Sequence, residues 1–162
     1  MKSGEALKRG DVIAVDRGAY KHFAVYVGEG EVIQYSAKGR DFGGNITVHR
    51  ATMPEFLKGS KEFSILAFPE EKEKPITFKE GLRKLLKGDI FALFHQMRRV
   101  KNYHLYTPEE TVKRAESRLG EASYNLVTDN CEHFAIWCKT GVSESRQVNA
   151  VLERLEQIII PW

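Results

Sequence analysis

Long apolar runs are missing from this sequence of 162 residues. No run reaches the roughly 18 apolar residues that a membrane-spanning helix needs, and the closing IIIPW is far too short for one. The opening MKSGEALKRGDVIAV has no apolar core of the kind that signal peptides carry, so we expect a cytoplasmic protein. A net charge of only +3 gives no reason to expect a nucleic-acid partner.

Cysteine is also scarce, since only Cys131 and Cys138 occur. On a helix, residues seven apart are separated by about 10.5 Å along the axis, whereas a disulfide needs Cα atoms within about 7 Å. Two free thiols fit a reducing compartment. The ligand spacings of a zinc site are absent as well, so we expect neither a metal nor another cofactor.

The composition is that of one soluble domain spanning residues 1–162, with 42% apolar and 29% charged residues. β-Branched runs broken by turn residues predict strands at 11–17, 22–28, 31–37, 46–51 and 62–68. Capping residues and helical spacing predict helices at 108–119, 131–139 and, as an amphipathic C-terminal helix, about 146–160. The fold class is therefore α+β, with an antiparallel sheet from the N-terminal half packed on helices of the C-terminal half.

The segment TDNCEHFAIWCKTG places Cys131 at the start of a predicted helix, directly after Asn130 as its cap. A helix N-terminus lowers the pKa of a thiol because its N–H groups and dipole favour the thiolate. Two interpretations remain open from position alone: a reactive nucleophile, or a small buried residue. Cys138 lies in the middle of the same helix, and we interpret it as structural.

A nucleophilic thiol needs a base, and the sequence offers five histidines. His133 follows Cys131 by two residues on the helix and faces away from it. His22 is the better candidate because it begins a strand, which holds an imidazole rigidly. The sequence gives no role to His49, His95 or His104.

The hairpin after His22 supplies a third group. If Val27 and Glu31 pair across the GEG loop, Ala24 lies opposite Gln34, and Gln34 becomes a diagonal neighbour of His22 on the same face. Its amide can then hold the imidazole in one tautomer. The alternative is an exposed strand glutamine, which a register slip of one residue would produce.

These segments together resemble a known family. NCEHFAIWCKTG followed by SRQV, with GDVIAV and YKHFAVYVGEGEVIQYSA upstream, is similar to the lecithin:retinol acyltransferase-like domain over residues from about 9 to 148. Within that family, the small phospholipase/acyltransferase enzymes are most alike. The resemblance implies a permuted papain-like, NlpC-related fold. It also implies Cys131 as nucleophile, His22 as general base and Tyr20 as a stabiliser of the oxyanion.

The family usually has a second histidine twelve residues after the first, and here that position is Gln34. The implied activity is that of a calcium-independent phospholipase A1/A2 and acyltransferase of glycerophospholipids. It works through an acyl-thioester on Cys131, which water, an amine or a lysolipid resolves. Two alternatives stay open: a thiol amidase or peptidase of the same superfamily, and a catalytically weak lipid- or protein-binding domain, which Gln34 motivates.

Residues 79–102 combine seven Lys or Arg and two acids with bulky apolar side chains. This composition fits a segment that lies in a membrane interface, and equally a core helix with a solvated basic face. On the membrane interpretation we expect a monomer that contacts a phospholipid surface peripherally, through Leu86, Ile90, Phe91, Phe94, Arg98 and Arg99.

Overall fold

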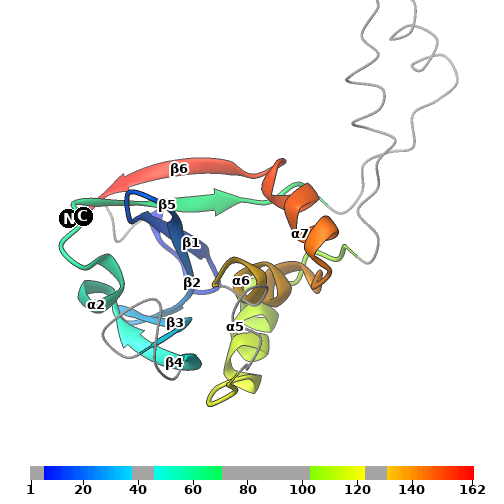
Figure 1. Ribbon diagram of the computed structural model, residues 1–162, viewed down its shortest axis with the longest axis horizontal. Helices are drawn as coiled ribbons and strands as arrows, with labels where there is room; N and C mark the ends of the chain where they lie inside the picture. Colours follow the sequence, from blue (N-terminus) through cyan, green and yellow to red (C-terminus); the bar gives the residue numbers. More distant parts are fainter. Residues whose placement is uncertain (1–5, 38–45, 71–102, 123–130) are drawn as a thin grey trace, which may run out of the picture.

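A computed structural model describes residues 6–37, 46–70, 103–122 and 131–162. A mixed arrangement of strands and helices confirms the α+β class (Figure 1). The five strands expected in the N-terminal half are all present. They are β1 (Val12–Asp16), β2 (Lys21–Gly28), β3 (Glu31–Ala37), β4 (Ile46–Thr52) and β5 (Glu62–Ala67).

These strands belong to one antiparallel sheet of six, in the order β4-β3-β2-β1-β5-β6. The central strands are buried at nearly every position, so side chains on both of their faces are covered. This explains why the sequence of β1 is a continuous apolar run, VIAV, without polar alternation.

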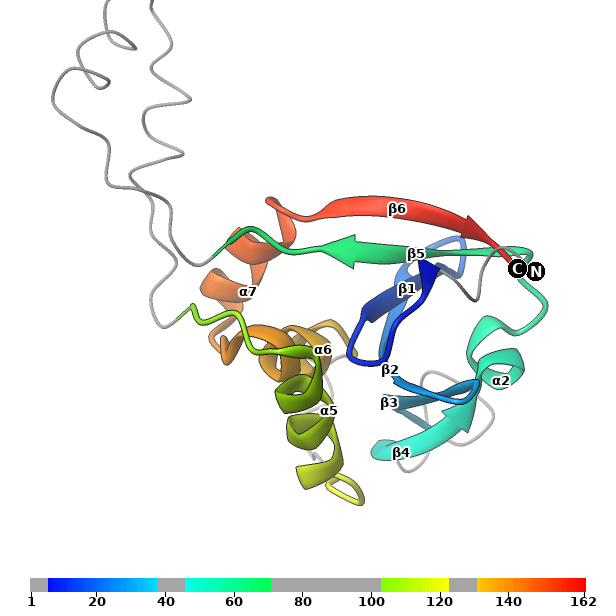
Figure 2. The same cartoon turned by 180° about the vertical axis from the view of Figure 1, so that it is seen from behind.

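Helices cover the two faces of the sheet separately. On one face α5 (Pro108–Ser117) and α6 (Cys131–Thr140) pack on β2 and β3, through a cluster that includes Val25, Ile33 and Phe134. On the other face the short α2 (Met53–Leu57) packs through Phe56. Figures 1 and 2 show α2 on the opposite side of β2 and β3 from α5 and α6.

Helix α2 was not among the predicted elements, although the sequence carries its signal. Thr52 accepts a hydrogen bond from the backbone N–H of Glu55, and the Glu55 carboxylate accepts one from the backbone N–H of Thr52, which is a complete capping box. Only five residues follow the cap, too few for a helical hydrophobic period. The helix is thus stabilised by its cap and by the burial of its apolar side chains against the sheet.

The C-terminal segment corrects the prediction of one long amphipathic helix at about 146–160. Helix α7 (Ser145–Leu152) ends early, and β6 (Glu156–Pro161) follows as an edge strand. Every residue of β6 pairs with one of β5, from Glu156 opposite Ala67 to Pro161 opposite Glu62. The β-branched run III favours a strand, and pairing with the open edge of β5 decides the outcome over helical periodicity. The sheet therefore also takes a strand from the C-terminal end of the chain.

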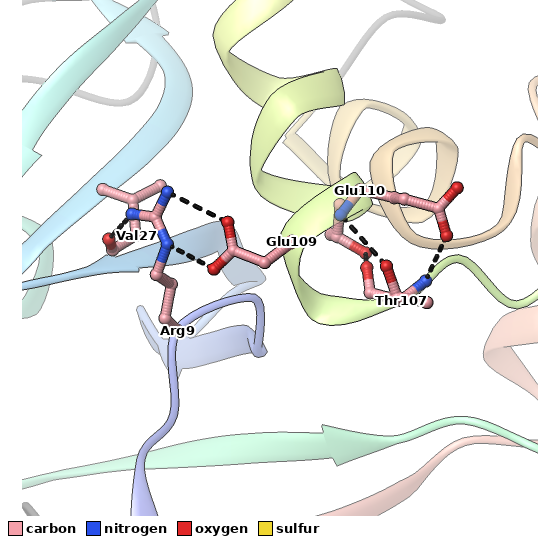
Figure 3. A network of polar contacts seen from close by, with 6 residues as sticks. Arg9, Val27, Thr107, Glu109 and Glu110 are labelled. Carbon is pink, nitrogen blue, oxygen red and sulfur yellow. Dashed lines mark hydrogen bonds and ion pairs between the residues drawn. The ribbon is translucent and has the colours of Figure 1, made fainter.

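The N-terminal segment is joined to α5 by an ion pair. Arg9 Nε donates to Glu109 Oε1 at 2.8 Å, and the same guanidinium donates to the carbonyl of Val27 (Figure 3). At the start of the same helix, Thr107 and Glu110 form a capping box (Figure 3), where the sequence predicted that a helix begins. These contacts fix α5 against the end of the β2–β3 hairpin.

Candidate functional site

His22 and Gln34 lie side by side on neighbouring strands. Ala24 of β2 pairs with Gln34 of β3, the register that the sequence predicted. His22 Nε2 lies 2.9 Å from Gln34 Oε1, a full hydrogen bond between side chains of two strands. Both are buried, with His22 1% and Gln34 6% exposed, so water does not compete for this bond.

The turn that sets this register differs from the predicted one. Gly28, not Val27, pairs with Glu31, and a register shift lies between Tyr26 and Gly28. Glu29 and Gly30 form the two-residue turn with positive φ angles of 53° and 75°. The bulge absorbs one residue, which restores the pairing of Ala24 with Gln34.

The His22 ring lies on the α2 face of the sheet. Its centroid is 5.6 Å from that of Phe56, which is itself fully buried in α2. This packing, with the hydrogen bond to Gln34, holds the imidazole between a helix and the neighbouring strand. Helix α2 therefore supports the candidate base, which sequence reasoning did not foresee.

Cys131 is the first residue of α6, and its side chain is buried at 6% exposure. Its Sγ lies 3.8 Å from the carbonyl oxygen of Lys21, the residue directly before His22. The structure thus brings the thiol to the backbone of the strand that carries the histidine.

An opening between β2 and β3 makes this approach geometrically available. Pairing of these strands stops at Ala24 and Gln34, although β2 begins at Lys21 and β3 continues to Ala37. The backbone N–H and C=O groups of Tyr26 hydrogen-bond toward β1. Along a strand, successive residues direct these groups to alternate sides, and Lys21 is five residues before Tyr26. The carbonyl of Lys21 therefore points to the β3 side. Among the described residues, β3 does not pair with this part of β2, and the start of α6 lies against the Lys21 carbonyl there.

Tyr20 lies in the turn between β1 and β2, half-buried, two residues before His22. Its carbonyl accepts a hydrogen bond from the backbone N–H of Arg17 at 2.9 Å, which closes the turn. It is the neighbour of Lys21, whose carbonyl contacts the thiol. The chain therefore places Tyr20 at the same end of β2 as His22 and Cys131.

The second cysteine is in a different environment. Cys138 is fully buried in the middle of α6, and burial raises the pKa of its thiol to about 12. A thiol with this pKa is protonated at neutral pH and is not a nucleophile. On the same helix, burial also raises the pKa of Glu132 above its ordinary value.

Two histidines on or near α6 make contacts of their own. His133 Nε2 lies 3.3 Å from Ser145 Oγ, at the start of α7. The His104 ring meets the Tyr106 ring edge-on at a centroid distance of 4.6 Å. These contacts join structural elements to one another.

A further polar residue, His49, contacts the site and was given no role from the sequence. It lies on β4 directly opposite Gln34, with 3.3 Å between His49 Nε2 and Gln34 Nε2. Finding it requires the register of β3 with β4, and eight residues (38–45) separate these two strands in the sequence. Short local patterns do not fix that register.

Asn130, His95 and the six residues expected to contact a membrane lie outside the described residues. In the part of the chain that is described, no helix has the length and apolar character needed to cross a membrane. The same part holds no group of three or more His, Cys, Asp or Glu side chains arranged to bind a metal ion.

Comparison with known proteins gives a consistent result. The family model described as Lecithin retinol acyltransferase matches residues 5–144. The chain is 36% identical to Phospholipase A and acyltransferase 2 of Homo sapiens over 149 residues, covering 88% of this chain and 76% of that protein. It is 32% identical to human Phospholipase A and acyltransferase 3 over 151 residues, 90% of this chain and 78% of that one. It is 27% identical to Lecithin retinol acyltransferase of Mus musculus over 169 residues, covering 93% of this chain and 62% of that protein.

Proposed function

Because the chain belongs to the lecithin retinol acyltransferase family, we propose that it is a cysteine-dependent phospholipase A1/A2 and acyltransferase acting on glycerophospholipids. The names of the relatives supply the reaction class. One observation in the structure carries the assignment of residues. The buried imidazole of His22 is hydrogen-bonded to Gln34 at 2.9 Å. The residue before it, Lys21, carries the carbonyl that the Cys131 sulfur contacts.

The order of these groups along the chain supports a permuted papain-like arrangement. His22 is on β2, and Cys131 is at the start of α6, so the base precedes the nucleophile. A helix that begins at the thiol and packs on the strand of the histidine brings both groups to one end of β2. We assign the fold on this basis, together with family membership.

In the first step, the Cys131 thiol transfers its proton to His22, and the thiolate attacks the carbonyl carbon of a phospholipid ester. The carbonyl electron pair moves to oxygen and forms a tetrahedral oxyanion. The N–H groups at the start of α6 and the Tyr20 hydroxyl stabilise that charge. When the C–O bond breaks, the imidazolium of His22 returns its proton to the leaving alkoxide. The products are a lysophospholipid and an acyl-thioester on Cys131.

In the second step, His22 removes a proton from the acceptor, which attacks the thioester carbonyl. Water as acceptor gives a fatty acid, and an amine or a lysolipid gives an acylated product. The Cys131 thiolate leaves and takes back a proton from the imidazolium of His22. No step in this sequence uses a calcium ion, so the activity is proposed to be calcium-independent.

Gln34 serves in this scheme as the group that orients His22. Its amide oxygen is uncharged, so it fixes the ring and its tautomer but stabilises the imidazolium less than a carboxylate would. The bond is buried and 2.9 Å long, which favours a fixed ring. In this proposal the amide orients the ring without carrying a charge.

Substrate delivery is proposed for the basic and apolar segment 79–102. Its lysines and arginines attract anionic headgroups, while Leu86, Ile90, Phe91 and Phe94 enter the interface. The double variant Arg98→Glu/Arg99→Glu should weaken sedimentation with vesicles that contain phosphatidylserine. Equal sedimentation of variant and wild type would remove this segment from the proposal and leave the thiol chemistry untouched.

The test of the function is lysophospholipid release from phosphatidylcholine vesicles in the presence of a calcium chelator. We expect release by wild type and by Cys138→Ala, which removes the other thiol, and none by Cys131→Ala or His22→Ala. Absence of release by wild type would reject the phospholipase assignment. Release that survives in Cys131→Ala would reject the thioester route. Hydrolysis of acyl-amide or peptide substrates alone would favour the amidase of the same superfamily.

A further inference from the structure

The His22–Gln34 pair has a third member on the next strand. His49 of β4 lies opposite Gln34, and its Nε2 is 3.3 Å from Gln34 Nε2. The other ring nitrogen, Nδ1, is 3.0 Å from the backbone carbonyl oxygen of Thr47. A row of side chains thus crosses three strands, from His22 through Gln34 to His49.

The carbonyl of Thr47 fixes the direction of every hydrogen bond in this row. A carbonyl oxygen only accepts, so Nδ1 of His49 carries the proton. A neutral imidazole has one N–H, which makes Nε2 of His49 an acceptor. The group of Gln34 that faces it must then be the NH₂, which donates. The amide oxygen is left for His22.

The tautomer of His22 follows from this direction. Because Gln34 Oε1 accepts, Nε2 of His22 carries the proton, and the lone pair of the neutral ring is on Nδ1. A base must present a lone pair to the group it deprotonates. The row of hydrogen bonds therefore leaves Nδ1 as the atom of His22 that can accept the thiol proton.

Gln34 does not set this direction by itself. The two ends of an amide are almost identical in shape, so packing does not distinguish the oxygen from the NH₂. With the amide turned by 180°, its NH₂ would face His22, Nε2 would have to accept, and the proton would move to Nδ1. Selection between the two states needs a partner that only accepts on the far side of Gln34.

We propose that His49 is a positioning residue that selects the amide orientation of Gln34 and, through it, the tautomer of His22. The proposal rests on the proposed function only where it links that tautomer to catalysis. The anchor of His49 is backbone, the Thr47 carbonyl on the same strand, so the polarity of the row is fixed by the β4 main chain.

Charged groups on the elements that pack against β4 have other partners. Arg50, the next residue, alternates to the opposite face of the sheet, where it pairs with Glu116 at 2.9 Å. Glu55 of α2 belongs to the Thr52 cap. On β3, the residues that share the face of Gln34 are Val32 and Ser36, which carry no charge. In the described fold, the side chain of His49 hydrogen-bonds with the Gln34 amide and the Thr47 carbonyl.

The first test measures the tautomer directly, in full-length protein with ¹⁵N-labelled histidine. Two-bond ¹H–¹⁵N correlation spectra distinguish a proton on Nε2 from one on Nδ1, and the His22 signals are assigned by their loss in His22→Asn. The measurement is made in the Cys131→Ala variant, because a Cys131 thiolate would favour the charged imidazolium of His22. Spectra are recorded above neutral pH, where an ordinary histidine is uncharged. We expect His22 as the Nε2–H tautomer, and a proton on Nδ1 would overturn the proposal.

Substitutions of His49 then test the cause. His49→Glu supplies a carboxylate of similar reach that, when ionised, only accepts, so it should keep the Nε2–H tautomer of His22. His49→Lys offers only donors and should move the His22 proton toward Nδ1, while His49→Leu should give a mixture. An unchanged Nε2–H tautomer in folded His49→Lys would overturn the proposal. If His49→Lys fails to fold, the contrast of His49→Leu with His49→Glu decides in the same way.

Lipid turnover gives the second readout. We expect kcat/KM to fall by about tenfold or more in His49→Leu, mostly in kcat, and to recover largely in His49→Glu. Equal losses in both variants would indicate a merely structural residue and would overturn the positioning role. The tautomer spectrum requires no substrate. If the wild type turns over no phospholipid but shows the Nε2–H tautomer, the proposed function fails while the positioning role stands.

Discussion

His22 Nε2 and Gln34 Oε1 lie 2.9 Å apart on adjacent strands, with both side chains almost completely buried. Burial strengthens this bond and makes the loss of either partner costly, because the remaining polar group is left without water. The β2–β3 register places the two side chains next to each other. Phe56 of α2 packs against the His22 ring. An orienting amide is therefore built into the sheet itself.

Substitution of Gln34 tests whether that amide is sufficient. We expect Gln34→Leu to lower kcat/KM for phosphatidylcholine by about 10- to 100-fold, because the imidazole loses its orienting partner. Gln34→His should change kcat/KM by less than about tenfold, since a second ring can replace the amide beside His22. A gain of several hundredfold in Gln34→His would contradict the account and indicate a site that the glutamine had weakened.

The pH dependence of stability should reflect Glu132. Burial raises the pKa of its carboxyl above the ordinary value of 4.5, so the folded state holds this proton more tightly than the unfolded state. Its contribution to the free energy of unfolding is therefore greatest at low pH and falls as pH rises from about 4.5 through the folded pKa. In Glu132→Gln the side chain does not ionise, so this stabilising contribution does not change with pH. Its stability relative to wild type should rise across that window in urea titrations, and a pH-independent difference would contradict the assignment.

Gly10 and Gly18 form a matched pair for testing how closely the chain packs on α5. Their φ angles are +95° and +93°, so a side chain at either position is strained. A Cβ at Gly10 would lie 2.5 Å from the Cα of Pro108, whereas at Gly18 it would meet nothing within 4 Å.

We therefore expect Gly18→Ala to cost about 1–2 kcal/mol in free energy of unfolding, from backbone strain alone. Gly10→Ala should cost about 1–3 kcal/mol more, because α5 must move. Denaturant titration of both variants measures the difference. Equal costs would mean that α5 does not press on this glycine.

Arg114 supports the end of α6 from the neighbouring helix. Its guanidinium lies 3.9 Å from the centroid of the Trp137 ring and 4.1 Å from that of Tyr106. It also donates to the backbone carbonyls of Trp137 and Cys138 in the last turn of α6.

Arg114→Lys keeps the charge but loses the planar fork, so we expect a loss of about 1–3 kcal/mol in free energy of unfolding. Arg146→Lys, at an exposed position of α7, is the control and should change stability by less than about 0.5 kcal/mol. Equal effects of the two substitutions would show that the stacked geometry of Arg114 contributes little.

Local patterns in the sequence predicted much of this fold. The five N-terminal strands, the start of α5 at Pro108 and the start of α6 at Cys131 each depend on neighbouring residues, and each is present. The β2–β3 register was also predictable, because a short turn connects the two strands. The pairing of Gln34 with His22 followed from it.

Long-range pairing explains what the sequence did not predict. Residues 156–161 have helical spacing as well as β-branched content, and only the open edge of β5 makes them a strand. His49 acquires its contact through the β3–β4 register, and Phe56 reaches His22 across the sheet face. These relationships join segments that no short motif connects.

The most direct test of the central claim is intact-protein mass spectrometry after brief mixing with phosphatidylcholine vesicles. Wild type and Cys138→Ala should each gain the mass of one fatty acyl chain, and peptide mapping should place it on Cys131. Cys131→Ala should gain none. If wild type gains no acyl mass and no lysolipid forms over hours, or if the acyl group maps to Cys138, Cys131 is not the lipid nucleophile.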